Sequence, residues 1–292
     1  MKTLFLVNAR SGANRRLDAA AIIRETCEWE HEIVPCGTKE ELDDVIASAA
    51  SRGIDVIFAV GGDGTVHEVG KRLIGSLIAF GVLPTGSGNG FARHLGVPMN
   101  LRAALGACRN LRVETIDTAT INGTPFINMI GAGFDAWVAD AFDKAGTRGL
   151  ATYLRVGLSG LRRYEPEEYE LTVDGVTTRY LAMAVVVANA SQYGNNARIA
   201  PLASIQDGML DITLIDRVSL FRLPMLAAQL VTGTFHRARG VSTMRGRSIT
   251  ITRHTSGAAH LDGEPVTLPE TLTIEIVPRS LRVIVPDSAG VI

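Results

Sequence analysis

The stretch AVGGDGTVHE, residues 59–68, places small and polar residues directly after an apolar run. Its three glycines add nothing to a core, and glycine is used where the backbone turns tightly or approaches another group closely. Asp63 and Thr65 bring a carboxylate and a hydroxyl into the same turn. This combination indicates a site for a charged ligand.

Two further loops have a similar composition and also lie between a strand-like and a helix-like segment, residues 8–12 (NARSG) and 84–89 (PTGSGN). In open α/β sheets, ligands bind beyond the carboxyl ends of the strands. If the strands are parallel, the three loops meet at one edge, where backbone N–H groups and helix N-termini bind anions. Three such loops favour a nucleotide-phosphate site over ordinary turns.

The usual phosphate-binding motifs do not occur in the sequence. It contains no GxxxxGK[ST] and no protein-kinase catalytic loop, and Gly86, Gly88 and Gly90 do not have GxGxxG spacing. Without a Walker lysine, phosphate charge must be met by Mg²⁺, backbone dipoles and arginine. Asp63 is the natural group to act on that metal, directly or through water.

The first part of the chain alternates strand and helix patterns, which predicts crossover units and a mostly parallel, Rossmann-like sheet. Thr38 with Glu41 three residues later predicts a capping box at the second helix. The expected strands are 3–8, 31–36, 56–60 and 78–83, and the expected helices are 14–27, 38–50, 65–74 and 87–95.

From about residue 115 the pattern changes to short strands and hairpin turns. The turn dipeptides are Asn122-Gly123, Asp174-Gly175 and Asp262-Gly263. Strands are expected at 180–189, 210–215, 248–253, 271–277 and 281–285, and helices at 149–163 and 219–232. The sequence therefore predicts an α/β domain over 1–118 and an antiparallel β-rich domain over 119–292, whose last strand could return to the first domain.

Composition limits the partners. The 292 residues include 29 basic and 30 acidic side chains, and a net charge of −1 argues against a nucleic-acid partner. Basic clusters at 162–163, 236–239 and 245–247 are interpreted as solvated surface, with anionic lipid headgroups as the alternative. Three cysteines without a CxxC pair, and no apolar run of about 20 residues, predict a cytoplasmic protein that is at most peripheral at the inner face of the membrane.

Two motifs resemble those of a known family. Residues 61–65, GGDGT, resemble the signature shared by diacylglycerol, sphingosine and NAD kinases and, less closely, phosphofructokinases. Residues 83–98, LPTGSGNGFARHLGVP, resemble the second signature of the diacylglycerol-kinase catalytic family. They depart from it at Asn89-Gly90, where many bacterial members have Asn-Asp. The resemblance implies an N-terminal domain like that of NAD kinase and phosphofructokinase, followed by an antiparallel β-sandwich.

The resemblance also implies which residues bind ATP. The first loop matches Asn-Pro-x-Ser-Gly with alanine in place of proline, and Thr38 falls where the family has a nucleotide-contacting threonine. Glu68 either stabilises its helix or touches nucleotide, and Asn89 either caps its helix or binds nucleotide. The expected ATP-binding residues are Asn8, Ala9, Arg10, Ser11, Gly12, Thr38, Gly61, Gly62, Asp63, Gly64, Thr65, Glu68, Thr85, Gly86, Ser87 and Asn89.

Metal ligands and a base follow from the same resemblance. Asp117 matches an aspartate of the family's metal–water network, and Ser204, Asp207 and the carbonyl of Met209 match the ligands of a structural Mg²⁺. Residues 260–266, HLDGEPV, match the Asp-Gly-Glu turn that supplies the family's general base. Glu264 is therefore the expected base, projected by the turn into a cleft between the domains, and Asp63 is the second expected catalytic residue.

The expected function is an ATP- and Mg²⁺-dependent lipid kinase that converts diacylglycerol to phosphatidic acid at a membrane surface. NAD kinase is an alternative, although the chain lacks that family's Asn-Glu pair. The other alternative is a catalytically weak relative that binds nucleotide or lipid as a regulator, which Gly90 keeps open. The sequence leaves a homodimer open as well.

Overall fold

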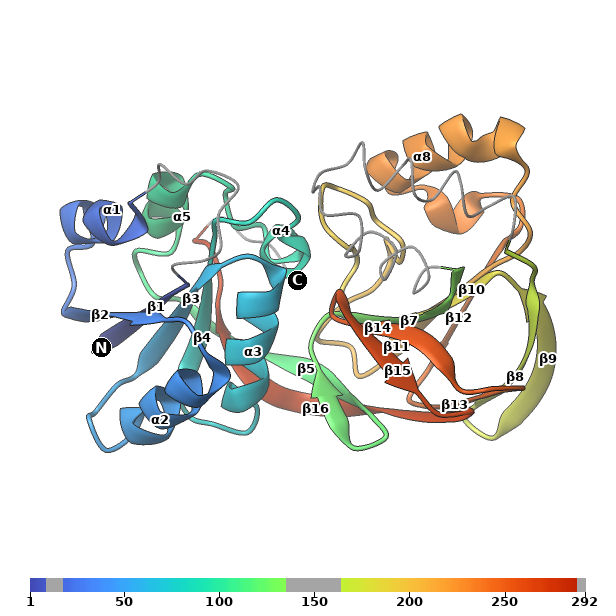
Figure 1. Cartoon of the computed structure of the whole chain (residues 1–292). Helices are drawn as coiled ribbons and strands as arrows, with labels where there is room; N and C mark the ends of the chain where they lie inside the picture. The colour runs from blue at the N-terminus through green and yellow to red at the C-terminus, as the bar shows by residue number, and fades with distance from the viewer. Residues whose placement is uncertain (9–17, 135–163, 288–292) are drawn as a thin grey trace. The chain divides into compact units, whose positions relative to one another are not determined.

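The computed structural model describes residues 1–8, 18–134 and 164–287 (Figure 1). Residues 9–12 of the first loop and the helix expected at 149–163 lie outside this range. The chain divides into two compact units, one comprising Met1–Thr118 and Pro278–Ile292 and the other comprising Ala119–Val277.

A parallel sheet forms the centre of the first unit, with the strand order β2-β1-β3-β4. Its strands are β1 (Thr3–Asn8), β2 (His31–Cys36), β3 (Val56–Gly61) and β4 (Ala79–Pro84). The C-terminal part of β16 (Thr271–Ile284) continues the sheet, because Val283 pairs in parallel with Phe80 of β4. All residues of β3 and β4 are buried, as expected for strands covered on both faces. The predicted Rossmann-like domain is confirmed.

Helices cover this sheet on both faces (Figure 1). They are α1 (Ala19–Thr26), α2 (Lys39–Ala49), α3 (Asp63–Leu73), α4 (Gly90–His94) and α5 (Leu101–Ala107). Right-handed crossovers put α1 on one face and α2 and α3 on the other, and α1 contacts α5 while α2 contacts α3. The capping box of Thr38 is present, with its hydroxyl accepting the Glu41 N–H at 3.2 Å. Helix α5, which Asn100 caps, was not predicted from the sequence.

The carboxyl ends of the four strands are level with one another. Asn8 lies opposite Cys36, Val7 opposite Val60, and Gly61 opposite Pro84. Because the strands are parallel, the loops that follow them start from the same edge of the sheet. This confirms the geometric premise for a shared ligand site.

Two antiparallel sheets form the second unit. One has the order β12-β11-β10-β7-β14-β15, and the other contains the N-terminal part of β16 followed by β13, β8 and β9, with β5 and β6 attached. Their bounds are β5 (Val113–Ile121), β6 (Thr124–Phe126), β7 (Met129–Gly133), β8 (Glu167–Val173), β9 (Val176–Ala182), β10 (Ala184–Ala188), β11 (Leu210–Ile215), β12 (Val241–Gly246), β13 (Ser248–Arg253), β14 (Gly257–Leu261) and β15 (Glu264–Leu268). The predicted antiparallel β-sandwich is confirmed.

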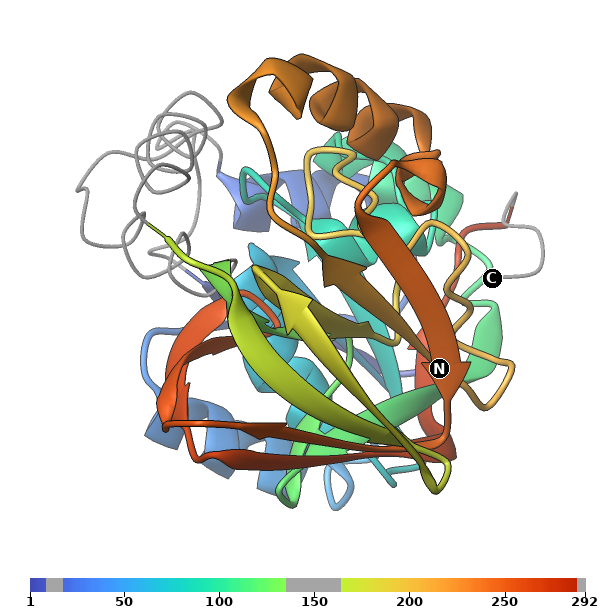
Figure 2. The same cartoon turned by 90° about the vertical axis from the view of Figure 1, so that its right-hand side faces the viewer.

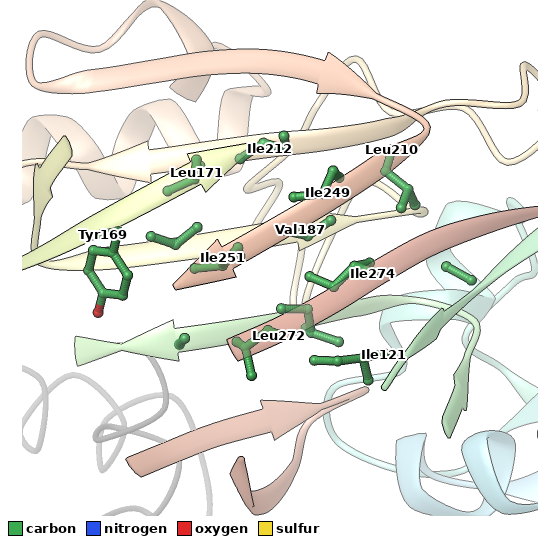
Figure 3. Packing of buried hydrophobic residues seen from close by; sticks show 14 of the residues in the cluster. Ile121, Tyr169, Leu171, Val187, Leu210, Ile212, Ile249, Ile251, Leu272 and Ile274 are labelled. Carbon is green, nitrogen blue, oxygen red and sulfur yellow. The ribbon is translucent and has the colours of Figure 1, made fainter. Parts of the chain in front are cut away.

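Alternation along the strands explains the core of this unit. Val187 and Ile212 of the six-stranded sheet meet Ile251 and Leu272 of the other sheet (Figure 3). Val186, on the opposite face of the six-stranded sheet, instead contributes to a second cluster under α8 (Leu223–Thr232). The central strands β7, β10 and β11 are thus buried on both faces of the six-stranded sheet.

The three predicted hairpin turns are present, and the first residue of each dipeptide has a positive φ of 47–50°. Two strand predictions were wrong in detail. Residues 180–189 do not form one strand, because the chain passes from one sheet to the other at Met183, between β9 and β10. Residues 271–277 and 281–285 are parts of one strand, β16, which continues through Arg279 at a φ of 50°.

Gly81 provides a test of how the first unit is packed. It lies opposite Phe58, and a Cβ added to Gly81 would lie 2.2 Å from the Phe58 ring. Phe58 is stacked on Phe5 with ring centroids 5.2 Å apart, so its ring has no free space to enter. We expect Gly81→Ala to lower the free energy of unfolding by about 1–3 kcal/mol through overpacking, measured by urea denaturation.

Gly106→Ala is the matched control. A Cβ at Gly106 in α5 meets nothing within 4 Å, so helix propensity alone should leave the variant at least as stable as the wild type. Equal stability of the two variants would contradict the packing described for Gly81.

Candidate active site

The carboxylate of Asp63 joins two of the three glycine-rich loops. Asp63 is the first residue of α3, and its Oδ2 and Oδ1 accept the backbone N–H groups of Asn89 at 2.9 Å and Gly90 at 2.7 Å. These are charge-assisted bonds to the start of α4, a position that favours a negative charge. Position 90 contributes its N–H to this contact, so no side chain is required there for it.

The glycines of the two loops allow their backbones to pack directly together. A Cβ on Gly86 would lie 2.6 Å from the Cα of Gly62, and a Cβ on Gly62 would lie 3.3 Å from the Cα of Gly86. Thr85 N–H also donates to the Gly61 carbonyl at 2.9 Å. A Cβ on Gly61 would lie 2.4 Å from the Thr65 hydroxyl. A side chain at Gly61 or Gly86 would therefore clash with its neighbour, and one at Gly62 would be in tight contact.

Asn8 connects the end of β1 to the same turn. Its Nδ2 donates to the hydroxyl of Thr65 at 2.9 Å, and Thr65 lies in the first turn of α3. The structure thus brings together Asn8, Thr65 and Asp63, which sequence reasoning had assigned to one site. Ala9, Arg10, Ser11 and Gly12 lie outside the described residues.

Asn89 has a conformation that leaves an acceptor unused. It is the N-cap residue of α4 with φ 55°, and its Nδ2 donates to the Gly86 carbonyl at 2.8 Å. Its Oδ1 is buried and has no hydrogen-bond partner among the described residues. A buried acceptor without a partner is costly, so this atom is suited to receive a donor from a ligand or water.

Two expected nucleotide contacts, Thr38 and Glu68, already have partners within the protein. The Thr38 hydroxyl caps α2, and the Glu68 carboxylate binds Lys71 at 2.8 Å, Lys39 at 3.0 Å and Arg72 at 2.5 Å. Burial acts to raise the pKa of Glu68, but hydrogen bonds from these three cations outweigh it and hold the pKa at about 2. Glu68 thus ties α2 to α3, and its contact with nucleotide stays a prediction.

Asp117 is almost fully buried in β5. Its Oδ1 accepts the backbone N–H of Arg279 at 2.8 Å, where β16 has its positive φ. Beside it, the hydroxyls of Thr118 and Ser280 lie 2.8 Å apart. Asp117 therefore helps to hold β16 in the first unit, and its role in a metal–water network stays a prediction.

In the second unit, Asp262 fixes the turn that presents Glu264. Its Oδ2 accepts the N–H of Ile127 at 3.0 Å, and its Oδ1 accepts those of Asn128 at 2.8 Å and Met129 at 2.9 Å. Asp262 is buried, whereas Glu264, the first residue of β15, is exposed and has no hydrogen bond or ion pair among the described residues. The turn thus holds a free carboxylate on a rigid support.

Sequence reasoning missed a group of buried amides around this turn. Asn128 donates to the Gln192 carbonyl at 3.2 Å, and Asn189 donates to the Ile127 carbonyl at 2.8 Å. The Asn128 Oδ1 and Gln192 Oε1 atoms are buried without a partner among the described residues. The signal in the sequence was polar residues directly after or before the apolar strands, at Asn128 and Asn189, which a search for acidic motifs ignores.

The side chain of Arg245 lies at the loop that was expected to bind a structural metal. Asp207 accepts the N–H of Met209 at 3.0 Å through Oδ1 and forms an ion pair with Arg245 through Oδ2. Arg245 also lies 3.3 Å from the carboxylate of Asp211, and the Ser204 hydroxyl accepts the N–H of Gln206 at 3.4 Å. The Asp207 carboxylate is thus directed to Arg245, and the role of Ser204, Asp207 and Met209 as metal ligands stays a prediction.

Two protein-domain families match the sequence. Residues 2–121 match the diacylglycerol kinase catalytic domain, and residues 128–285 match the YegS C-terminal NAD kinase beta sandwich-like domain. The second match alone spans more than half of the chain. The order of the two matches is the order of the two units.

Curated relatives carry related names. A Klebsiella pneumoniae protein named "Probable lipid kinase YegS-like" is 31% identical over 285 residues, which cover 95% of this chain and 91% of that protein. A Mycobacterium tuberculosis protein named "Diacylglycerol kinase" is 30% identical, covering 86% of this chain and 83% of that protein. An uncharacterised Synechocystis protein is also 30% identical over 80% of this chain, but the match spans only 55% of its length.

Solved structures show the same fold. A structure described as a diacylglycerol kinase from Bacillus anthracis has a TM-score of 0.74 at 20% identity, covering 99% of this chain and 98% of that one. An NAD kinase from Archaeoglobus fulgidus in complex with ATP has a TM-score of 0.52 at 16% identity, covering 98% and 94%. At these identities the likeness establishes the fold, and the expected similarity to the NAD-kinase fold is confirmed.

Replacing the Asp63 carboxylate tests its contact with the second loop. In Asp63→Asn, one side-chain oxygen remains to accept an N–H, while the amide nitrogen faces the other N–H. We expect this variant to lose about 1–3 kcal/mol of unfolding free energy, because a buried donor is left without an acceptor. Asp44→Asn, at an exposed position of α2, is the control and should remain within about 0.5 kcal/mol of wild type.

The Glu68 cluster predicts a pH dependence of stability. The folded-state pKa of Glu68 is depressed to about 2, so its stabilisation is complete above its unfolded value, near 4.5, and is lost as the pH falls through the interval between the two. The difference in unfolding free energy between wild type and Glu68→Gln should therefore be constant from about pH 7 to pH 5 and shrink toward about pH 3. Urea denaturation across this range measures it.

Glu40→Gln, an exposed carboxylate in the first turn of α2, is the control and should show a small difference at every pH. A Glu68→Gln difference that stays constant down to about pH 3 would contradict the three-cation environment of Glu68.

Proposed function

Because this chain belongs to the family of YegS-like lipid kinases and diacylglycerol kinases, we propose that it transfers the γ-phosphate of ATP to a lipid hydroxyl. Diacylglycerol is the proposed acceptor and phosphatidic acid the product. The observation that carries the proposal is the contact of Asp63 with Asn89 and Gly90, because it makes one site from two glycine-rich loops at the edge of a parallel sheet.

The nucleotide is proposed to bind along this edge. The close contact of Gly62 with Gly86 brings the backbone N–H groups of both loops to this edge, and the first turn of α3 presents the kind of helix N-terminus that binds phosphate. The unpartnered Asn89 Oδ1 can accept a hydrogen bond from the nucleotide or from a water beside it. The same proposal includes Asn8, Ala9, Arg10, Ser11, Gly12, Thr38, Gly61, Gly64, Thr65, Glu68, Thr85 and Ser87.

Asp63 and Asp117 are the proposed carboxylates for the metal that accompanies ATP. The Asp63 carboxylate lies where the two glycine-rich loops meet, so it is placed to bind a metal ion there, directly or through a water molecule. Mg²⁺, when bound, neutralises phosphate charge that develops during transfer. The donors Ser204, Asp207 and Met209 would first have to release Arg245, so we derive no step from a metal there.

Glu264 is the proposed general base. Its carboxylate takes the proton from the lipid hydroxyl as the hydroxyl oxygen bonds to the γ-phosphorus and the bond from phosphorus to the β,γ-bridging oxygen breaks, releasing ADP. The free carboxylate at the turn suits this role, since no internal cation competes for it among the described residues. Asp262 acts as a positioning residue, because its three N–H bonds hold the turn.

A membrane surface and the cytoplasm are the proposed setting, since the acceptor is a lipid. Within the described residues, no helix has the length and apolar character needed to span a bilayer. The lipid would therefore be met at the surface of the membrane, with the chain bound peripherally.

The test is transfer of labelled γ-phosphate from ATP and Mg²⁺ to diacylglycerol in mixed micelles, with sphingosine, monoacylglycerol, phosphatidylglycerol and NAD as separate acceptors. We expect labelled phosphatidic acid with the wild type. Glu264→Gln should reduce the rate by about 10²–10⁴-fold, the usual contribution of a general base. Glu270→Gln, an exposed carboxylate in the same unit, should leave the rate unchanged.

Label in NAD would contradict the lipid-kinase proposal, and label in a different lipid would correct the acceptor. ATP binding without transfer to any acceptor would identify the chain as a regulatory relative. A Glu264→Gln variant with full activity would remove Glu264 as the base while leaving the reaction in place.

A further inference from the structure

The helix α8 has an apolar face on its outer side. The short 3₁₀ turn Leu220–Arg222 precedes it, and both lie on the face of the six-stranded sheet that is turned away from the sandwich core (Figures 1 and 2). Leu226 points inward and packs against Val186 of that sheet. On the other side, Phe221 is 96% exposed, Met225 47% and Val231 58%. The outer side is as apolar as the inner one.

This face departs from the normal pattern of a surface helix. The sequence of α8, LPMLAAQLVT, contains no charged residue. Surface helices place charged or polar side chains toward water, and a helix that is apolar all round is normally buried in protein or lipid. Pro224, Ala227 and Ala228 share the exposed side with Met225 and Val231, at helical spacings of three and four residues.

Another exposed apolar residue lies near the end of α8. Gly233 ends the helix, and a Cβ there would lie 3.8 Å from the side chain of Pro201. Leu202, the next residue, is 64% exposed. The Arg198 N–H donates to the Leu230 carbonyl at 3.0 Å, so the segment 198–202 packs along the C-terminal end of the helix. We call Phe221, Met225, Val231 and Leu202 the apolar face.

Arginines flank the apolar face along the chain. Residues 217–247 contain six arginines and no acidic residue. Arg222, Arg237 and Arg239 have no ion pair among the described residues, and Arg237 and Arg239 are exposed just beyond the helix. Two of the six are paired, Arg217 with Glu165 and Arg245 with Asp207. The exposed arginines therefore provide net positive charge beside apolar side chains.

We propose that the apolar face docks on an anionic lipid bilayer, with Phe221, Met225, Val231 and Leu202 entering the boundary between headgroups and acyl chains. Apolar side chains with neighbouring arginines are the combination by which interfacial helices bind such membranes. Each basic residue near an anionic surface adds electrostatic attraction to it. The proposal depends on the proposed function in one respect: a lipid substrate gives the chain a reason to bind a membrane.

Charge favours a bilayer over a second copy of the chain as the occupant. In a twofold dimer the same patch lies on both partners, so the unpaired arginines around the two faces would oppose one another. An anionic bilayer instead supplies phosphates to these arginines and an apolar phase to the face between them. The second copy remains an outcome that the experiment distinguishes.

The first experiment is co-sedimentation of the full chain with vesicles of phosphatidylcholine containing about 30% phosphatidylglycerol. We expect the wild type to bind, and the double variant Phe221→Glu with Met225→Glu to bind at least about tenfold more weakly, because two charges enter the apolar boundary. Leu77→Glu, at an equally exposed apolar residue of the first unit, is the control and should bind like the wild type.

A second double variant tests the contribution of the arginines. Arg237→Glu with Arg239→Glu should weaken binding to the same vesicles by about tenfold or more, and salt should weaken wild-type binding. Arg24→Glu with Arg109→Glu makes the same change in net charge at exposed positions of the first unit and should have a much smaller effect. Pure phosphatidylcholine vesicles should bind the wild type weakly.

Equal vesicle binding by wild type and by the Phe221/Met225 variant would overturn the proposal. So would sedimentation velocity showing a wild-type dimer that this variant dissociates, because a second copy would then cover the face. Phosphate transfer to a short-chain diacylglycerol dispersed as monomers should be unaffected by this variant. Vesicle binding without any transfer would refute the proposed function and leave the docking surface standing.

Discussion

Most of the candidate site depends on one interaction, the acceptance of two backbone N–H groups by the Asp63 carboxylate. The strands β3 and β4 are neighbours, but the loops that follow them carry no apolar side chain that could hold them together. The carboxylate supplies that attachment at 2.7 and 2.9 Å, and the glycines at 62 and 86 let the backbones close to van der Waals contact. A hydrogen bond to a charged group contributes more than a neutral one, which suits a contact made at the edge of a sheet. This contact fixes the backbones of the two loops relative to each other.

The second unit uses the same device for a different purpose. Asp262 accepts three N–H bonds from residues 127–129, and Glu264 follows two residues later without a partner among the described residues. In both units the aspartate of a glycine motif holds backbone, and the group offered to a ligand lies beside it. The two motifs GGDG and LDGE are therefore informative for the same physical reason. In both motifs a glycine follows the aspartate, and at Gly263 the turn requires it because φ is 89°.

Much of the fold could be predicted from short stretches of sequence. Features that depend on contacts between distant residues could not be predicted in this way. The alternation of strand-like and helix-like segments located the strands of the parallel sheet, and Thr38 with Glu41 marked the start of α2. The change of sheet at Met183 was missed because residues 180–188 contain no glycine, proline or other turn residue, and only pairing with different neighbours separates β9 from β10. In the site, the sequence indicated Asp63 and the glycines but not the partners of the carboxylate. It assigned Asp207 to a metal, and only the pairing of β11 with β12 reveals that Arg245 lies beside that loop.

The distribution of charge shows how an overall balance can conceal a local positive segment. The net charge of −1 argues correctly against a strongly basic chain, and it led to the interpretation of the basic clusters as ordinary solvated residues. Yet six of the 29 basic residues fall within 217–247, where no acidic residue occurs, so the other 23 are outnumbered by all 30 acidic ones. The rest of the chain therefore has a net negative charge, whereas this segment is positive and is attracted to an anionic surface. In this segment α8 has apolar side chains on both its sides, and the sequence pattern cannot tell which side faces the core. The sheet beneath the helix decides this by burying Leu226, and the unburied side is left among the arginines.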